Sequence, residues 1–494
     1  MNDPLANSRS AEAALERRAP PGLGHLWTLG LVLVAVGWML SVESSAGGPL
    51  DEQLVPPEPA PGASVDGDPA EGYRLLTQKA YLPPDFDQET IDRVWEVWPE
   101  PWRQQAAEAD SDRRRQMIWD RYGLTPRPDD PDKPLQYVVD AEGRWTMNCL
   151  ACHGGAVAGQ SLPGRPNTNY ALELLTEETR RLKFRLGKQP GRMDLGSVFI
   201  PLGKNRGTTN AVMFGVALMA FRDAELNVYL HRRSPVMTHH DMDAPPWWHF
   251  HRKQNLYIDG FAPKGVRGLM QFMMVRENGP EKFREWEADF RHVYAFLESI
   301  RPPKYPAAID HVTAERGRQV FESRCAECHG TYGPNGTYPE RRIPLAEIGT
   351  DRVRFDALRA ADRRSYAESW FAYYGQHRVE LAPDGYVAPP LDGVWASAPY
   401  LHNGSVPTLW HLLRPDRRPE VWRRRGTGQE EYDYQRVGLA VEELAEVPAG
   451  VSGGWEVREY FDTTKFGKSH AGHDFPASLT EDQRDDLLEY LKTL

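Results

Sequence analysis

Apolar residues recur with helical spacing in four segments of the chain, residues 88–121, 281–301, 313–325 and 480–494. The second segment is the most regular, and Pro302 and Pro303 end it. The last segment begins with Thr480 and Gln483, whose spacing of three residues is that of a capping box. Runs that alternate between apolar and polar residues, as strands do, are few. The pattern therefore predicts a mainly α fold.

The same order of segments occurs twice along the chain. In each half, a leading segment is followed by a Cys-x-x-Cys-His motif, a long irregular stretch and a terminal amphipathic helix. This internal repeat predicts two tandem helical domains, residues 72–303 and 308–494. The first domain carries a long insertion, residues 160–280, that is rich in Pro, Gly and His.

An apolar segment at residues 26–42 contains no charged residue, and its length is at the short limit for a helix that crosses a bilayer. Arg17 and Arg18 precede it, and the next basic residue is Arg74. The positive-inside rule then places residues 1–25 in the cytoplasm and the rest of the chain outside. We therefore expect a single-pass transmembrane anchor in the inner membrane, with the folded domains facing the periplasm.

Residues 43–71 follow this segment and are rich in Pro, Gly and acidic residues, without an apolar period. Such a composition is typical of a flexible, semi-extended tether. A cleaved signal peptide is the alternative to an anchor, because Ser44, Ser45 and Ala46 are small residues of the kind that a signal peptidase accepts. The apolar segment is longer than the usual core of a signal peptide, which favours the anchor.

The chain of 494 residues has a formal net charge of −11. Nucleic acid is therefore not expected as a partner, because a phosphate-binding surface needs clustered Lys and Arg that outweigh the acids. A solvated face is favoured over a docking patch for an acidic redox partner as the explanation of one basic cluster. That cluster consists of Arg417, Arg418, Arg423, Arg424 and Arg425.

All four cysteines of the chain belong to two Cys-x-x-Cys-His motifs, Cys149, Cys152 and His153 in one and Cys325, Cys328 and His329 in the other. The two thiols of such a motif form thioethers to one porphyrin, and the adjacent imidazole binds its iron. A zinc site would need a further Cys or His pair at short range, and a thioredoxin-like site is expected beside a βαβ pattern. The motifs therefore predict two covalently bound c-type haems, with His153 and His329 as proximal ligands.

The distal ligand decides whether a haem carries electrons or activates oxygen or peroxide. The last methionine is Met274, so the second haem has no methionine ligand within its own domain. Its histidine candidates are His377, His402, His411, His470 and His473. His473 lies in a short glycine-containing loop, KSHAGHDF, just before the closing helix, and is the preferred candidate. An ordinary surface or core role is the alternative for every one of them.

The distal side of the first haem has no single candidate. The possible ligands are Met193, Met213, Met237, Met242 and the pairs His239/His240 and His249/His251. Most of the methionines are expected to be core residues. The stretch DAPPWWHFHRKQN concentrates two Trp and two His beside prolines, and it either lines a distal pocket or forms a proline-braced packing loop.

The run APPLDGVWASAPYLHNGSVPTLWHLL resembles the segment that bacterial diheme cytochrome c peroxidases carry after their second haem. Together with DAPPWW and the Gly-x-x-His stretch before LLEYLKTL, it resembles most the rubber-oxygenase-like branch of that superfamily. The resemblance covers mainly residues 308–494 and, more loosely, 145–300. It implies two cytochrome c-like domains and a distal histidine near the chain end, which corresponds to His473. Peroxidases of the group use a distal methionine there, which this chain lacks.

Two functions follow as hypotheses. The first is a membrane-anchored diheme cytochrome that transfers electrons to other redox proteins or to a membrane respiratory complex. The second is a peroxidase- or oxygenase-type enzyme whose chemistry takes place at the first haem, which rubber oxygenases keep open for oxygen. A haem-based sensor is a third possibility, but the short cytoplasmic segment contains no signalling element.

Overall fold

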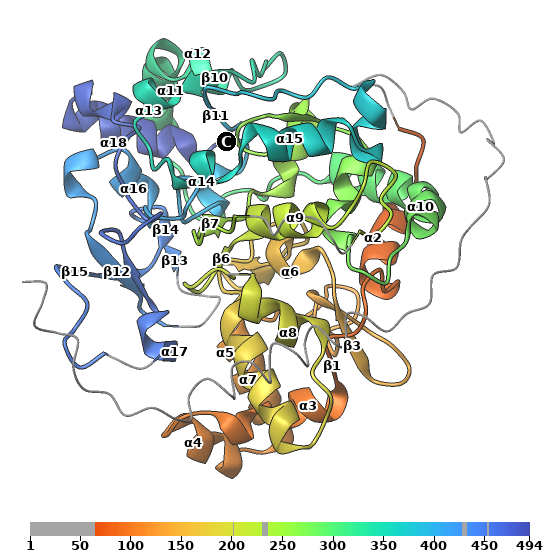
Figure 1. Ribbon diagram of the computed structural model, residues 1–494. Coiled ribbons are helices and arrows are strands. Elements are labelled where there is room, and N and C mark those ends of the chain that lie inside the picture. The colour runs from red at the N-terminus through yellow and green to blue at the C-terminus, as the bar shows by residue number, and fades with distance from the viewer. Residues whose placement is uncertain (1–64, 201, 230–235, 427–431, 452–453) are drawn as a thin grey trace, which may run out of the picture. The chain divides into compact units, whose positions relative to one another are not determined.

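The computed structural model describes residues 65–200, 202–229, 236–426, 432–451 and 454–494. The described residues belong to one compact unit, shown in Figure 1. The expected cytoplasmic segment 1–25, the apolar segment 26–42 and most of the tether 43–71 lie outside the described residues. The first helix among the described residues begins at Pro69, three residues before the expected start of the first domain.

Helices are spread along the described chain. The α-helices are α2 (Pro69–Gln78), α3 (Gln88–Arg93), α4 (Trp102–Glu108), α5 (Ser111–Tyr122), α6 (Leu150–His153), α7 (Leu172–Arg185), α8 (Arg192–Phe199), α9 (Ala211–Ala220), α10 (Pro280–Ser299), α11 (His311–Arg324), α12 (Ala326–His329), α13 (Leu345–Ile348), α14 (Val353–Ala357), α15 (Ala360–Ala367), α16 (Leu409–Leu412), α17 (Gly454–Val457) and α18 (Glu481–Leu491). The 3₁₀ helices are η1 (Val94–Val97), η2 (Trp247–Arg252), η3 (Arg267–Met273), η4 (Trp370–Gly375), η5 (Val394–Ala396), η6 (Pro415–Arg417) and η7 (Phe475–Ser478).

Short antiparallel strands lie between these helices. Two sheets have three strands, one in the order β1 (Phe86–Asp87), β3 (Arg144–Met147), β2 (Tyr137–Val139) and one in the order β15 (Val441–Leu444), β12 (Val421–Arg424), β16 (Tyr460–Asp462). The two-stranded pairs are β4 (Ala156–Val157) with β5 (Gln160–Ser161), β6 (Thr208–Thr209) with β7 (Met242–Asp243), β8 (Asn255–Leu256) with β9 (Ala262–Pro263), β10 (Arg342–Pro344) with β11 (Gly385–Val387), and β13 (Tyr432–Asp433) with β14 (Gly438–Leu439).

The prediction of a mainly α fold behind a transmembrane helix is wrong. The described residues combine the helices with sixteen strands. These strands have two to four residues each, which is too short to produce a readable alternation of apolar and polar positions. Their pairing instead depends on hydrogen bonds to segments that are distant in sequence, as between β12 and β16.

The structure also contradicts the predicted single-pass anchor and the inner-membrane location that followed from it. None of the helices in the described ranges is both long enough and apolar enough to cross a bilayer. The segment on which the prediction rested, residues 26–42, is not among those residues.

The helices with the clearest periodicity are confirmed. The segment 281–301 forms α10, and 313–325 forms most of α11. The segment 480–494 forms α18, and Thr480 caps it with the predicted reciprocal hydrogen bonds to Gln483. The segment 88–121 is instead divided into α3, η1, α4 and α5, because Pro99 and Pro101 interrupt the helical ladder.

Buried apolar side chains form three clusters, and the largest draws on both halves of the chain. It combines α2, α9, α10 and η3 with residues 357–372 of the second half. The helices α2 and α10 pack side by side, as do α11 and α18 (Figure 1). Gly317 permits the second contact, since a Cβ atom there would lie 1.9 Å from the backbone oxygen of Asp486.

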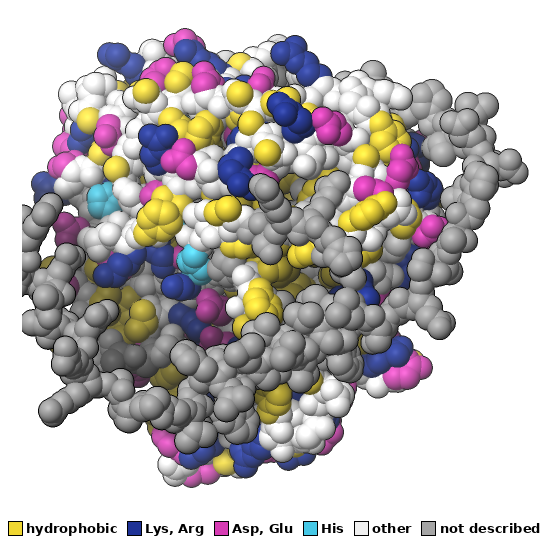
Figure 2. All heavy atoms as spheres, in the orientation of Figure 1, with side chains coloured by type: hydrophobic (Ala, Val, Ile, Leu, Met, Phe, Trp, Pro, Cys, Tyr) yellow, Lys and Arg dark blue, Asp and Glu magenta, His cyan; other side chains and the backbone are white. Residues whose placement is uncertain are grey.

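Charged side chains of both signs are interspersed over the described surface in Figure 2. Many of them form ion pairs within one helix, such as Arg318 with Glu322 and Arg352 with Asp356. Exposed pairs of this kind contribute little to stability individually. The fold therefore rests on its apolar clusters and on a smaller number of buried ion pairs.

Candidate haem sites

The first Cys-x-x-Cys-His motif begins where strand β3 ends. Asn148 follows the strand, and its side-chain oxygen accepts the backbone N–H of Leu150 at 2.9 Å. Its amide group donates to the carbonyl oxygen of Leu135 at 3.1 Å. Cys149 then occupies the N-cap of helix α6, which ends at His153. The two thiols and the imidazole are therefore held on a single helical turn at the end of a sheet.

His153 has a defined orientation. Its Nδ1 atom lies 3.0 Å from the carbonyl oxygen of Pro245, to which it donates. Its ring stacks on Trp247, with 4.9 Å between the ring centres and 21° between the planes. The backbone N–H of Trp247 in turn donates to Gly164, whose own N–H donates to the His153 carbonyl. These contacts fix the tautomer and leave Nε2 free to bind a metal.

The second motif follows helix α11 and ends in the short helix α12. His329 repeats the contact of His153, because its Nδ1 lies 2.8 Å from the carbonyl oxygen of Pro389. The Tyr332 hydroxyl donates to the His329 carbonyl at 3.0 Å and accepts the N–H of Leu391 at 2.6 Å. The segment around Pro389 is thereby tied to the motif at two points.

His473 faces His329. The centres of the two rings lie 6.1 Å apart, with 65° between the planes. The backbone N–H of His473 donates to Ile348 at 2.6 Å, and the residue has a left-handed φ of 51°. Gly472 before it also has a positive φ, and a Cβ atom there would lie 2.2 Å from Gly349. This loop thus needs a glycine to bring the imidazole to its place.

Arg418 binds the backbone of the same loop. Its Nη1 atom donates to the carbonyl oxygens of His470 at 2.6 Å and Gly472 at 2.7 Å. Burial lowers the pKa of the His473 imidazole to about 3, so the ring is neutral at pH 7 and able to bind a metal. The Nδ1 atom of His473 is buried without a hydrogen-bond partner among the described residues.

The facing pair fits a haem iron. With a metal–nitrogen bond of about 2.0–2.1 Å, two imidazoles on opposite sides of one metal ion have ring centres roughly 6 Å apart. The 6.1 Å between His329 and His473 has this value. Burial also lowers the pKa of His153 to about 4 and the pKa of His329, which keeps both proximal candidates neutral. The residues present therefore suit two haems, and the second with histidine on both sides.

The buried thiols differ from those of a thioredoxin-like exchange site. None of the four forms a disulfide. Burial raises the thiol pKa of Cys149 to about 11 and those of Cys152 and Cys325 to about 12, whereas a thiol-exchange site needs a lowered pKa. Within the described ranges, no group of three or more His, Cys, Asp or Glu side chains is arranged to hold a metal ion.

The other histidine candidates of the second half have other contacts. His402 packs on Tyr386, with 4.7 Å between ring centres, and His377 stacks on Tyr373. His411 contacts Thr408 at 2.7 Å, and His470 contributes its carbonyl to Arg418. Their positions are accounted for by packing and by loop hydrogen bonds.

The candidates of the first half are mostly engaged as well. The sulfur of Met213 accepts the N–H of Thr238 within the main core, and Met242 belongs to strand β7. In the DAPPWWHFHRKQN stretch, His249 lies 3.0 Å from the Asp392 carbonyl and His251 2.7 Å from that of Trp248. Among the described ring contacts, the partner of His153 is Trp247, and no imidazole faces it.

That stretch also connects the two motifs. Trp247 stacks on His153, and the indole N–H of the adjacent Trp248 donates to the Asp392 carbonyl at 2.7 Å. Asp392 follows Leu391, which is bonded to Tyr332 beside His329. A continuous path of packed and hydrogen-bonded groups therefore joins the first site to the second.

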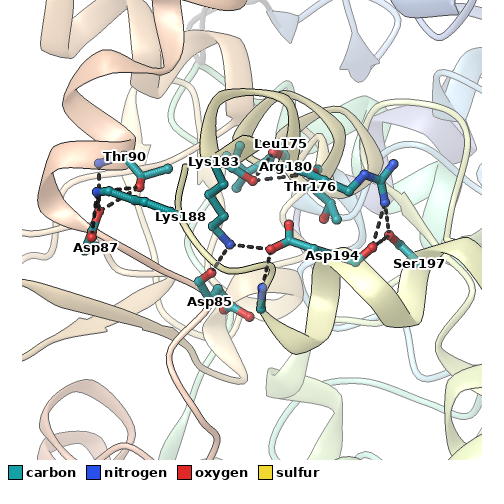
Figure 3. A network of polar contacts seen from close by, with 12 residues as sticks. Asp85, Asp87, Thr90, Leu175, Thr176, Arg180, Lys183, Lys188, Asp194 and Ser197 are labelled. Atoms are coloured by element: carbon teal, nitrogen blue, oxygen red, sulfur yellow. Dashed lines mark hydrogen bonds and ion pairs between the residues drawn. The ribbon is translucent and has the colours of Figure 1, made fainter. Parts of the chain in front are cut away.

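A buried polar network contacts the end of strand β3, just before the first motif (Figure 3). Lys183 of α7 contacts the Asp194 carboxylate of α8 and the backbone oxygen of Asp85, each at 2.5 Å. The carboxylate of Asp85 accepts the N–H of Met147, two residues before Cys149, at 3.0 Å. Burial raises the pKa of Asp85 to about 7. The network thereby links the segment that carries the first motif to helices α7 and α8.

One segment of the second half is similar to a known protein family. Residues 385–423 match the RoxA-like, cytochrome c-like family. This match supports a cytochrome c family and a haem-dependent redox protein. The cytochrome c-like segment contains Pro389, the hydrogen-bond partner of His329, and His402.

Two relatives from Sinorhizobium fredii (strain NBRC 101917 / NGR234) match part of the chain. The uncharacterised protein y4iM is 34% identical over 236 residues, which cover 40% of this chain and 52% of that protein. The uncharacterised protein y4iJ is 30% identical over 262 residues, which cover 40% of this chain and 41% of that protein. The chain thus spans about half the length, or less, of the curated relatives it matches.

The two proline carbonyls that accept hydrogen bonds from the motif histidines were not predicted from the sequence. A signal for them was present, since the tripeptide Ala-Pro-Pro occurs in both halves, at 244–246 and 388–390. In each case, the carbonyl of the first proline accepts from the motif histidine. Trp247 lies in the stretch DAPPWWHFHRKQN and Arg418 in the basic cluster, but the contacts of both are defined only by the folded chain.

Proposed function

We propose that this protein is a c-type cytochrome that holds two covalently bound haems and transfers electrons between them and other redox proteins. Cys149 and Cys152 attach the first haem, and Cys325 and Cys328 attach the second. His153 and His329 are the proximal ligands, and His473 is the distal ligand of the second haem. The observation that carries the proposal is the pair of facing imidazoles, His329 and His473, beside a cytochrome c-like segment.

Each bound haem supplies an iron that alternates between its ferric and ferrous states. The chain's own residues orient the imidazoles, exclude water and hold the two sites in one unit. Histidine on both sides lowers the reduction potential relative to a histidine–methionine pair, so the second site suits an electron carrier. The contacts from Trp247 through Trp248 to Asp392 support electron exchange between the sites.

A haem count tests this proposal. The wild-type protein is expected to carry two covalent haems by pyridine haemochrome analysis and intact mass. The variant C149S/C152S and the variant C325S/C328S should each retain one. A wild-type protein that carries a single haem, or none, would overturn the proposal.

A second candidate function is an enzyme of the peroxidase or oxygenase type with its chemistry at the first haem. The observation in its favour is the difference in ring partners, an indole beside His153 and an imidazole opposite His329. Addition of carbon monoxide to the reduced protein and of peroxide to the oxidised protein discriminates between the two functions. Ligand binding at the haem that is retained in C325S/C328S supports the enzyme. Two low-spin haems that bind neither ligand support electron transfer alone.

A further inference from the structure

A buried ion cluster near the second site carries an excess positive charge. Arg354 of α14 and Arg363 of α15 both contact one oxygen of Asp259, at 3.2 and 2.7 Å. The side chains of all three are at most 4% exposed. His240 and His402 lie close to Arg354, but burial lowers their pKa values to about 4 and 3, so they are neutral. The cluster therefore contains two guanidinium groups for one carboxylate.

Arg354 has an unused pair of donors. Its Nη1 atom contacts Asp259, whereas its Nε and Nη2 atoms are buried without a hydrogen-bond partner in the described structure. These two atoms lie on the same edge of the guanidinium plane, and their N–H groups form the parallel fork that binds a carboxylate in bidentate fashion. A buried cation with such a free edge requires an anion.

Two segments of the second site are hydrogen-bonded to the stretch of chain that leads into Arg354. Six residues before Arg354, the Ile348 carbonyl accepts the N–H of His473. In the opposite strand β11, the Tyr386 hydroxyl donates to the carbonyl of Asp351 at 3.2 Å. Strand β11 then leads within two residues to Pro389, the partner of His329. Both segments that hold the imidazoles of this site are thus bonded to residues that lie six and three positions before Arg354.

We infer that Arg354 is a positioning residue that binds a haem carboxylate of the second haem through its Nε and Nη2 atoms. The inference rests on the proposed function, because it requires a haem at Cys325 and Cys328. The carboxylate of a porphyrin side chain supplies the missing negative charge and two acceptor oxygens. Arg363 remains bonded to Asp259 and keeps that acid paired, while Arg354 serves both acids.

The test uses the purified full-length holoprotein and the variants R354L, R354K and R352Q. Arg352 is a matched control, because it lies two residues away, is 70% exposed and pairs with Asp356. Redox titration of each haem and resonance Raman spectra of the haem carboxylate bending mode are the readouts. In R354L we expect the reduction equilibrium constant of the second haem to fall about tenfold, which is about 59 mV for a one-electron couple.

The charge-retaining variant R354K should move the potential less but still shift the Raman mode, and it guards against a failure of R354L to fold. R352Q should change neither readout. Unchanged readouts in both Arg354 variants, or a shift confined to the first haem, would overturn the inference. So would an effect of added acetate or octanoate on wild-type spectra that R354L abolishes, since the site would then bind a free carboxylate.

Failure of the proposed function is seen separately. It is a wild-type preparation without covalent haem at Cys325 and Cys328, detected by the haem count before any Arg354 variant is measured.

Discussion

The two Cys-x-x-Cys-His sites hold their histidines through the same kind of hydrogen bond but differ in the ring that contacts each histidine. In both, the motif histidine donates from Nδ1 to the first proline carbonyl of an Ala-Pro-Pro tripeptide, at 3.0 Å for His153 and 2.8 Å for His329. The ring contacts differ, because His329 faces the imidazole of His473, whereas His153 stacks on the indole of Trp247. The proximal geometry is thus repeated, and the remaining ring contacts are not.

The difference indicates which part of a haem site can favour electron transfer and which can favour binding of a small ligand. A proximal imidazole held by a carbonyl is needed at any haem, because it fixes the tautomer that binds iron. A second imidazole saturates the metal and favours electron transfer, while a site without one leaves room for a small ligand. The described residues keep the first feature in both halves, and they supply the second feature where the loop 467–473 brings His473 to His329.

The substitution H473A should have the largest effect on this comparison. Removal of the imidazole is expected to convert the second haem from low spin to high spin completely, while the first haem keeps its spectrum. Optical and electron paramagnetic resonance spectra measure the change. H470A, a change in the same loop, is the control and should leave both spectra intact. A second haem that stays low spin in H473A would reject His473 as its ligand.

The substitution R418L tests whether the loop needs its support. It removes the hydrogen bonds from Nη1 to the carbonyls of His470 and Gly472. Hydrogen bonds from a charged group contribute about 1.5–3 kcal/mol each, so the loss of both should lower the free energy of unfolding by about 3–6 kcal/mol. Denaturant unfolding followed at the second haem measures it.

Arg417 provides the matched control, because it is adjacent and 68% exposed. The variant R417L should be indistinguishable from wild type. If R418L and R417L behave alike, Arg418 does not hold the His473 loop.

The first site should respond to pH through Asp85. Burial raises the pKa of this carboxyl from 3.8 to about 7, so the folded state binds its proton more tightly than the unfolded state. The resulting stability is fully present below pH 4 and is lost as the pH rises to 7. In D85N, which keeps an acceptor for the Met147 N–H, we expect this loss, on the order of 4 kcal/mol, to disappear. Thermal midpoints between pH 4 and 8 measure it, and an equally steep profile in D85N would contradict the prediction.

The substitution W247L should have the smallest effect. It keeps an apolar side chain but removes the ring that stacks on His153, and aromatic pairs contribute about 0.5–1.5 kcal/mol beyond the area they bury. Unfolding followed at the first haem should show a loss of this size, with the second haem unaffected. W102L, at the exposed start of α4, is the control. An equal change at both haems would indicate a general packing defect.

Local sequence was sufficient to predict the longer helices. The apolar periods of α10 and α18 persist over three turns or more, and the capping residues Thr480 and Gln483 lie within the same turn. The strands escaped prediction because two to four residues do not establish a period. The membrane anchor was predicted from hydropathy alone, and it finds no counterpart among the helices that the structure describes.

The candidate site divides in the same way. The spacing of Cys149, Cys152 and His153 is a property of the chain itself, because three groups on one helical turn lie together in any fold. His473 was one of five histidine candidates, and only the folded chain brings it to His329 across more than a hundred residues.

The two Cys-x-x-Cys-His motifs and the helices with local signals can therefore be read from the sequence. The tertiary structure decided which carbonyl orients each imidazole, which ring lies opposite or beside it, and where Arg354 directs its free donors. These are contacts between segments 60 to 150 residues apart, and no local period or spacing encodes them. They form because burial of the shared cores leaves polar groups that must find partners from whichever segments the packing brings close.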